Sequence, residues 1–253
     1  MFKLVLSAGH GLNTAGKRCL KSLDKNETRE WYLNDRICDK IESKLKAYEE
    51  YMLLRVDDTT GKTDVPLKTR SDSSNKWGAD LYLAVHHNAG INGGNGGGVV
   101  AYVYTSPTSK SLEWQKALYN AIIEKTGLKG NRATPLAKAN LHECREPKAA
   151  SVLLECGFMD SKTDVPIILT DKFADQVATA CVEQIVKIGK LTKKKSNKTK
   201  FKDENKMSTW AIDSIKKVSD AGIMNGDTNG NFNPKANITR EEVAVVIANL
   251  LNK

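Results

Sequence analysis

The 253-residue sequence contains no apolar run of the length that a membrane span or an export signal requires. A membrane-spanning helix needs about 20 consecutive apolar residues, and a signal peptide has an apolar core of about 7–15 residues. The N-terminal segment, residues 1–7, is apolar for only a few positions before glycine, histidine and polar residues follow. We therefore expect no membrane insertion and no export through a signal peptide.

Paired cysteines are also missing. The five cysteines are odd in number, and no two of them are spaced as Cys-x-x-Cys. The sequence thus predicts neither a disulfide framework nor a thiolate zinc site, and it fits synthesis in a reducing cytosol. Cys156 and Cys181 lie in apolar segments, where a cysteine usually behaves as a small hydrophobic residue.

Positive charge is unevenly distributed along the chain. Residues 190–202 carry seven lysines and no acidic residue, whereas residues 1–189 carry 26 basic and 23 acidic side chains and residues 203–253 carry 6 and 7. The lysine tract lacks periodic apolar residues, which indicates a solvated linker. No aromatic platform or recognition helix accompanies it, so we expect no nucleic-acid partner. The predicted domains are residues 1–189 and 207–253, joined by a basic linker at 190–206.

Extended and helical patterns alternate through the first domain. The expected strands are residues 2–7, 81–85, 98–104 and 151–154, and the expected helices are residues 30–48, 112–126 and 171–188. Apolar residues recur at helical spacing in the helices, as at Leu33, Ile37 and Ile41. The alternation predicts an α/β fold in which helices cover a mostly parallel, twisted sheet. Active sites in such folds lie at the carboxyl ends of the strands.

Chemically reactive side chains follow the expected strands. His10 comes just after the first strand, His86 and Glu155 end two later strands, and Glu30 opens the first long helix. Two histidines and a glutamate can hold a catalytic zinc ion that keeps one position open for water, and a further glutamate can carry protons. The sequence therefore predicts a hydrolase with one zinc ion bound by His10, Glu30 and His86, and with Glu155 as the catalytic residue.

Three further polar residues, His87, Asn88 and His142, are candidates for roles at this site. Consecutive strand residues point to opposite faces, so only one of His86 and His87 can readily be a ligand. We choose His86 and place His87 at the rim of the site. His142 is the main competing ligand, but we expect it to contact the substrate instead, as we do for His87 and Asn88.

Residues 1–189 resemble the zinc-dependent N-acetylmuramoyl-L-alanine amidases (type 3) that form the catalytic domains of phage endolysins and bacterial autolysins. Four motifs carry the resemblance, in the order found in the family. They are Gly9-His10-Gly11, Glu30 with Asn34 four residues later, Ala84-Val85-His86-His87-Asn88-Ala89, and Ser151-Val152-Leu153-Leu154-Glu155-Cys156-Gly157-Phe158. Glu27 lies one helical turn before Glu30, but only Glu30 has the family's spacing to Asn34.

The sequence departs from the family pattern at three places, none of which removes an expected ligand. Ser7 replaces the usual acid before the first glycine, Ala84 replaces a serine, and Ala150 stands near an expected proline. Arg70 also resembles a family position, for which we expect a structural role. The glycine-rich residues 93–98 lack the Gly-Lys-Ser/Thr of a phosphate loop, and we expect a mobile loop beside the substrate groove.

The resemblance implies cleavage of the amide between N-acetylmuramic acid and L-alanine in peptidoglycan. Zinc at His10, Glu30 and His86 would lower the pKa of a water molecule toward ~7. Glu155 would take a proton from that water and return it to the departing alanine nitrogen.

The C-terminal residues 207–253 show two helical segments around a polar loop. The first helix ends at Gly222, and the second begins with the capping box Thr239-Arg240-Glu241-Glu242. The loop residues 227–231 resemble part of a calcium loop, but Ile238 occupies the position of its final glutamate. We therefore expect a helix-loop-helix unit without calcium.

The same unit resembles one S-layer homology repeat. The matching residues are Trp210-Ala211 and the segments 221–227, 230–234 and 238–242. Repeats of that family bind secondary cell-wall polymers and usually act in threes, which implies peptidoglycan and an anionic wall polymer as partners. Because so small a unit struggles to bury a sufficient core, we hypothesise that the C-terminal units associate as trimers. Met207 could start a separate binding-domain product.

Together these features predict a peptidoglycan-hydrolysing amidase. Lack of an export signal favours a phage endolysin, which is cytoplasmic until a holin releases it and then acts on the Gram-positive cell wall. A host autolysin of the same chemistry, a different zinc peptidase and a non-catalytic wall-binding protein are the alternatives. The complete ligand set and Glu155 argue against the last of these.

Overall fold

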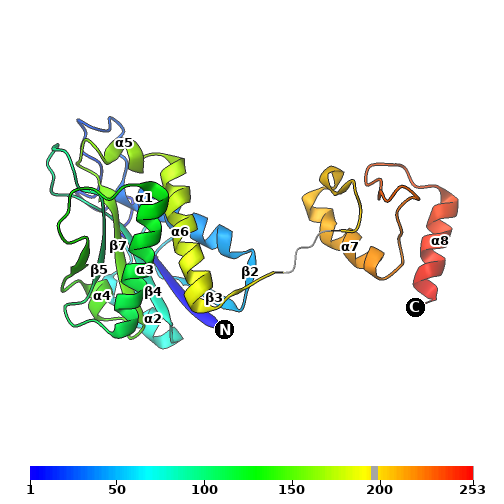
Figure 1. Ribbon diagram of the computed structural model, residues 1–253, viewed down its shortest axis with the longest axis horizontal. Helices are drawn as coiled ribbons and strands as arrows, with labels where there is room; N and C mark the ends of the chain where they lie inside the picture. Colours follow the sequence, from blue (N-terminus) through cyan, green and yellow to red (C-terminus); the bar gives the residue numbers. More distant parts are fainter. Residues whose placement is uncertain (195–198, 253) are drawn as a thin grey trace. The chain divides into compact units, whose positions relative to one another are not determined.

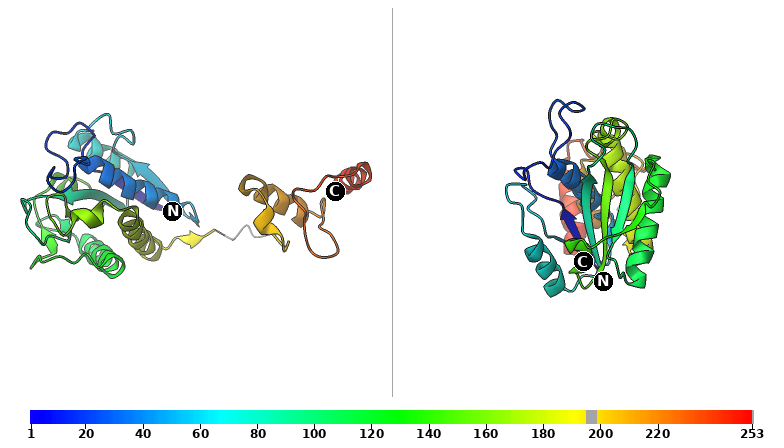
Figure 2. Two further views of the ribbon diagram at one scale, coloured as in Figure 1. Left: turned by 90° about the horizontal axis from the view of Figure 1, so that it is seen from above. Right: turned by 90° about the vertical axis from the view of Figure 1, so that its left-hand side faces the viewer.

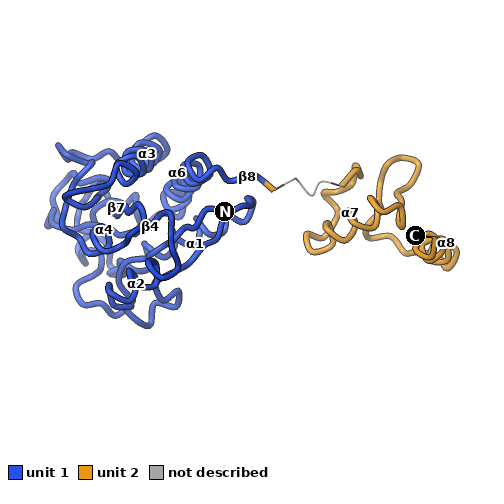
Figure 3. Tube along the Cα trace, turned by 90° about the horizontal axis from the view of Figure 1, so that it is seen from below, with its two compact units in different colours: residues 1–193 blue, residues 194–253 orange. Residues whose placement is uncertain are grey.

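The computed structural model describes residues 1–194 and 199–252, and the chain divides into two compact units (Figures 1 and 3). The first unit spans residues 1–193 and the second spans residues 194–253. The centre of the predicted linker, residues 195–198, lies outside the described residues. Among the described residues, no helix is both long enough and apolar enough to cross a membrane.

A six-stranded sheet forms the centre of the first unit, with the strand order β3-β1-β4-β7-β5-β6. The strands are β1 (Phe2–Ala8), β3 (Tyr51–Arg55), β4 (Leu81–Asn88), β5 (Val99–Val103), β6 (Leu136–Lys138) and β7 (Ala150–Phe158). All neighbouring pairs are parallel except β5 with β7. The central strands β4 and β7 are buried along almost their whole length, as expected for a sheet covered on both faces. The predicted α/β fold with a mostly parallel sheet is confirmed.

Helices cover both faces of this sheet (Figure 2). One face carries α1 (Glu30–Leu45), α3 (Ser109–Thr126) and α6 (Asp171–Gly189), and the other carries α2 (Leu67–Trp77) and α4 (His142–Arg145). The short α5 (Val165–Ile168) lies beside β7 and α6. On α1, Leu33, Ile37 and Ile41 follow helical spacing and are buried in the same core as Leu4 and Leu6 of β1.

Several elements of the first unit were not expected from the sequence, among them α2, β3, β6 and the short helices α4 and α5. α2 has only three buried side chains, Arg70, Ser71 and Ser74, so it has no apolar periodicity to detect. The edge strand β3 is only partly covered, with a mixed burial pattern. Two expected strands also continue further than predicted, so that His86 and Glu155 lie inside β4 and β7 and not just beyond them.

Parts of the predicted linker belong to folded structure. Leu191 is buried in the main core, and β8 (Thr192–Lys193) pairs antiparallel with β2 (Tyr48–Glu49) in the first unit. In the second unit, Phe201 is buried and its ring lies 5.1 Å from that of Phe232. The described structure therefore has a shorter connection than residues 190–206, because apolar residues near both of its ends are packed.

The second unit contains two helices and a small core. α7 (Ile212–Asp220) and α8 (Arg240–Leu251) are joined by a loop, and two 3-10 turns, η1 (Glu204–Lys206) and η2 (Thr209–Ala211), precede α7. Phe201, Met207 and Ile215 form the core. The predicted capping box is present, because Thr239 accepts a hydrogen bond from the Glu242 backbone and donates its own backbone N–H to the Glu242 carboxylate.

Candidate metal centre

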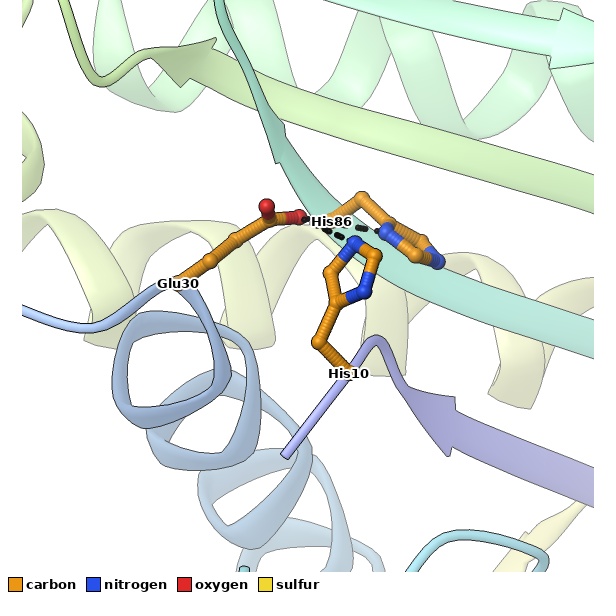
Figure 4. A group of neighbouring side chains, drawn as sticks. All are labelled: His10, Glu30 and His86. Atoms are coloured by element: carbon orange, nitrogen blue, oxygen red, sulfur yellow. Dashed lines mark hydrogen bonds and ion pairs between the residues drawn. The ribbon is translucent and has the colours of Figure 1, made fainter. Parts of the chain in front are cut away.

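Three side chains from separate elements meet at the carboxyl ends of β1 and β4 (Figure 4). His10 follows β1, His86 lies in β4, and Glu30 is the first residue of α1. The Glu30 Oε1 atom lies 3.4 Å from His10 Nε2 and 3.2 Å from His86 Nδ1. Each residue offers one ligand atom, and these atoms all lie within 4.8 Å of one another.

The backbone at residues 9 and 10 is shaped to allow this meeting. A Cβ atom at Gly9 would lie 2.1–2.6 Å from atoms of the His86 imidazole ring, so only glycine leaves room for the ring. His10 itself has φ 66°, in the left-handed region that non-glycine residues seldom adopt. This turn directs the His10 side chain to Glu30 as soon as β1 ends.

The donor set and its spacing fit a zinc ion. In a tetrahedral site with ligand bonds of about 2.1 Å, two ligand atoms lie about 3.4 Å apart. The separations of 3.4 and 3.2 Å from Glu30 Oε1 match that value. The second Glu30 oxygen, Oε2, is buried without a hydrogen-bond partner, and Lys17 Nζ lies 3.7 Å from it.

Electrostatic coupling among these residues is strong. Burial alone would raise the pKa of Glu30, but hydrogen bonds from His10 and His86 hold that pKa well below its usual range. Burial would lower the pKa of His86, whereas hydrogen bonds to Glu143 and Glu30 raise it to about 10. The cluster therefore stabilises an anionic carboxylate facing positive charge, the arrangement that a divalent cation would also stabilise.

Glu143 is a component of the site that the sequence analysis missed. Its Oε2 atom lies 3.0 Å from His86 Nε2, and the side chain is buried. Its other oxygen, Oε1, accepts hydrogen bonds from Ser7 Oγ at 2.5 Å and Tyr82 Oη at 2.8 Å. One sequence feature pointed to such a residue. Ser7 stands where the resembling family usually has an acid, so a carboxylate from elsewhere in the chain can fill the space beside it.

Glu155 lies beside the three clustered residues. It is the register partner of His86 on the adjacent strand β7, so the two side chains lie on the same face of the sheet. Its Oε2 atom is buried without a hydrogen-bond partner. Burial raises the pKa of Glu155 to about 7; the charge of His86 opposes this rise, and that of Glu30 adds to it. A carboxyl group with such a pKa can both accept and release a proton near neutral pH.

A cavity of about 330 Å³ adjoins Glu155. It is lined by Ala15, Gly16, Lys17, His87, Asn88, Ala89, Glu155 and Met159. The cavity thus lies between the end of β4 and the loop that precedes α1.

The other histidines take different positions from His86. His87 is buried rather than at the rim, its Nδ1 lies 2.8 Å from Asn34 Oδ1, and burial lowers its pKa to about 3, so the ring is neutral. Asn88 is half-buried and lines the cavity with His87. His142 lies at the start of α4 with its Nε2 3.1 Å from Ser71 Oγ, and the structure brings it neither to the three clustered residues nor to the cavity lining.

Hydrogen bonds from neighbouring side chains reach the glycine-rich residues 93–98 and the residues just before them. Asp160 Oδ2 accepts hydrogen bonds from the backbone N–H groups of Gly90, Ile91 and Asn92. Asp164 Oδ2 likewise accepts from Gly98. Two buried carboxylates that follow β7 thus hold residues 90–92, just before the segment, and its last residue, Gly98.

Comparison with known protein families gives two matches. Residues 4–187 match the family model described as N-acetylmuramoyl-L-alanine amidase, and residues 200–244 match the S-layer homology domain. The two matched ranges fall in the first and second units, respectively.

Curated relatives and solved structures agree with these matches. The chain is 35% identical to an endolysin of Bacillus phage SPP1 over 83% of this chain and 74% of that protein. It is 27% identical to a sporulation-specific N-acetylmuramoyl-L-alanine amidase of Bacillus subtilis over 70% of this chain and 64% of that protein. The crystal structure of an N-acetylmuramoyl-L-alanine amidase from Clostridium difficile 630 shares the fold, with a TM-score of 0.66, 23% identity, and coverage of 75% of this chain and 97% of that one.

Proposed function

Since the chain belongs to the N-acetylmuramoyl-L-alanine amidase family and hydrolyses peptidoglycan, we propose that it does so with one zinc ion held by His10, Glu30 and His86. The observation that carries the proposal is the convergence of three ligand atoms within 4.8 Å beside a glutamate that is not one of them. The bond cleaved is the amide between N-acetylmuramic acid and L-alanine.

Glu155 is the residue that we assign to proton transfer. Bound zinc would polarise the amide carbonyl and lower the pKa of the attacking water. Glu155 lines the cavity, has an oxygen without a hydrogen-bond partner, and has a pKa of about 7. It can therefore take the proton from the water and give it to the departing alanine nitrogen.

We assign substrate contacts to the cavity beside Glu155. Asn88 has a half-buried amide there, and the neutral His87 ring lies next to it. Lys17 also lines the cavity, and its Nζ lies 3.7 Å from Glu30 Oε2. His142 lies outside this lining, so we give it no contact with the scissile amide.

We assign the second unit to attachment of the protein to the cell wall. Membership of the S-layer homology family implies binding to the cell wall, and we propose an anionic secondary wall polymer as the partner. We further propose that these units associate as trimers, because α8 buries none of its residues. Five apolar side chains of α8 are exposed, namely Val243, Val245, Ile247, Leu250 and Leu251. Sedimentation of the full chain should give three times the mass of one copy; a single-copy mass would contradict the association.

The setting that we propose is lysis of a Gram-positive host by a phage endolysin. The 35% identity to the SPP1 endolysin supports it, whereas the Bacillus subtilis relative is a bacterial amidase and represents the host alternative. Whole-cell lysis by protein added from outside, or expressed together with a holin, would test the endolysin role.

The decisive experiment is digestion of purified Gram-positive peptidoglycan with and without a chelator, followed by identification of the new chain ends. We expect newly exposed N-terminal L-alanine, which disappears with the chelator and returns with added zinc. The Glu155→Gln variant serves as the matched control, because it retains the proposed zinc ligands. Other peptide ends would indicate a zinc peptidase, and chelator-resistant release of L-alanine would refute the zinc proposal.

A further inference from the structure

A chain of four buried polar groups ends on the outer nitrogen of His86. Arg70 Nη1 lies 2.9 Å from Ser7 Oγ, Ser7 Oγ lies 2.5 Å from Glu143 Oε1, and Glu143 Oε2 lies 3.0 Å from His86 Nε2. All four side chains are buried. No part of the proposed reaction requires Arg70, Ser7 or Glu143, so their arrangement needs a separate explanation.

The direction of each hydrogen bond in this chain follows from chemistry. A guanidinium group only donates, so Arg70 donates to Ser7. The single hydroxyl hydrogen of Ser7 is then free to bond with Glu143 Oε1, which also accepts from Tyr82. An ionised carboxylate only accepts, so His86 must donate its Nε2 hydrogen to Glu143 Oε2.

Glu143 thus fixes one hydrogen on Nε2 of His86. Without a metal, the protonated ring also donates from Nδ1 to Glu30 Oε1. When a metal replaces the Nδ1 hydrogen, the neutral ring keeps its hydrogen on Nε2 and presents its lone pair on Nδ1. Nδ1 is the atom that faces Glu30 Oε1 at 3.2 Å, on the side of the ring where His10 also lies. Carboxylates that bind the far nitrogen of a ligating histidine orient the ring and raise its basicity.

The same guanidinium also holds the turn that carries the other histidine. Arg70 donates to the backbone carbonyl of Ala8 at 2.6 Å and to that of His10 at 3.3 Å. Arg70 thus contacts His10 directly, through its backbone carbonyl, and contacts His86 indirectly, through Ser7 and Glu143.

We propose that Glu143 is a positioning residue that holds His86 in the Nε2–H tautomer and so prepares Nδ1 to bind zinc. The inference deepens the proposed function and rests on it. Ser7 and Tyr82 orient Glu143, and Glu143 orients His86.

The test compares two variants by zinc affinity, measured by competition with a chromophoric chelator. Glu143→Gln keeps the size of the side chain, but its amide has only one acceptor oxygen. The carboxylate accepts from Ser7 and Tyr82 with one oxygen and from His86 with the other. We expect the zinc affinity of this variant to fall about 10–100-fold. Glu146→Gln is the matched control, because it makes the same change on a nearby exposed side chain that pairs with Arg145. Its zinc affinity should stay close to that of the unmodified chain.

A second measurement reads the tautomer directly and requires no variant. Long-range ¹H–¹⁵N correlation of the histidine rings in the zinc-loaded protein should show His86 protonated on Nε2 and metal-bound through Nδ1. Zinc on Nε2, or an unprotonated Nε2, would refute the inference even if Glu143→Gln does not fold.

The outcomes separate this inference from the proposed function. If the unmodified chain binds no zinc, the zinc proposal itself fails. If the unmodified chain binds zinc and Glu143→Gln binds it equally well, Glu143 only stabilises the fold, and the inference alone fails. A lower unfolding midpoint of zinc-free Glu143→Gln with unchanged zinc affinity would support that structural role.

Discussion

His86 and Glu155 are register partners on the adjacent parallel strands β4 and β7. Side chains at partner positions of a parallel pair lie on the same face, so the sheet holds these two at a fixed separation. His86 joins the cluster with His10 and Glu30, whereas Glu155 stands next to it without being part of it. Metal binding and proton transfer should therefore be separable by substitution.

Removing the carboxylate of Glu155 should abolish hydrolysis but not zinc binding. Glu155→Gln keeps the size of the side chain and leaves His10, Glu30 and His86 in place. Loss of general acid–base catalysis typically lowers a rate about 10²–10⁴-fold. Turbidity of peptidoglycan suspensions and elemental analysis measure the two properties, and near-normal lysis would show that Glu155 does not carry the proton.

Substitution of His10 should remove both zinc and activity. His10→Ala leaves only two of the three clustered ligand atoms. The matched control is His142→Ala, because His142 contacts Ser71 and lies outside the cluster. We expect stoichiometric zinc in the control and little in His10→Ala after dialysis; equal zinc contents in the two proteins would exclude His10 as a ligand.

Substitution of Arg70 should destabilise the first unit. Arg70 is 1% exposed and donates to the Ser7 hydroxyl and to the carbonyls of Val65 and Ala8. Leaving a buried acceptor unsatisfied costs ~1–3 kcal/mol, so Arg70→Met should lower the free energy of unfolding by about 3 kcal/mol or more.

Chemical denaturation of the zinc-free protein measures this loss. Arg145→Met is the control, since Arg145 makes an exposed ion pair with Glu146 and such pairs contribute ~0–1 kcal/mol. Similar losses in both variants would contradict the role given to Arg70.

The second unit should lose stability in acid. Hydrogen bonds from the Asn231 backbone and the Asn233 side chain lower the pKa of Asp227 to about 2, and backbone hydrogen bonds also lower the pKa of Asp203 although burial opposes them. A carboxylate whose pKa is depressed in the folded state stabilises the fold above its unfolded pKa of about 3.9. That contribution is lost as the pH falls from about 4 through about 2.

Amide signals of the loop between α7 and α8 provide the measurement for this prediction. We expect them to lose protection over that pH range in the unmodified chain. Asp227→Asn should already be destabilised at pH 7 and should show a weaker dependence on pH. An unchanged pH profile in the variant would mean that Asp227 does not contribute.

Local patterns in the sequence were sufficient to predict a mostly parallel sheet, the main helices and the three residues that cluster at the site. Helical spacing identified α1, α3 and α6, and strand ends placed His10, His86 and Glu155 along one edge. Both family resemblances are confirmed by the matches over residues 4–187 and 200–244. These signals lie within short segments, so they can be read without knowing the tertiary structure.

Glu143, α2 and the anchoring of the glycine-rich segment could not be predicted in the same way. Glu143 and His86 are 57 positions apart in the sequence, and they come together because α4 packs on β7. The three buried residues of α2, Arg70, Ser71 and Ser74, are all polar, and Arg70 bonds to β1 instead of packing in an apolar core. Asp160 and Asp164 lie in a loop without a distinctive sequence pattern. Only the structure shows that their carboxylates accept hydrogen bonds from backbone N–H groups of another loop.

His10 has a left-handed backbone with φ 66°, so the residue that we expect to bind the metal also strains the fold. Such a conformation costs a side chain with a Cβ atom ~1–2 kcal/mol that glycine would not incur. A His10→Gly protein would be free of that strain, but it would lose the contact with the buried Glu30 carboxylate and could not complete the metal cluster. Residue 10 should therefore be held constant in any search for more heat-stable variants of this enzyme, because a gain in backbone freedom there is a loss of the metal site.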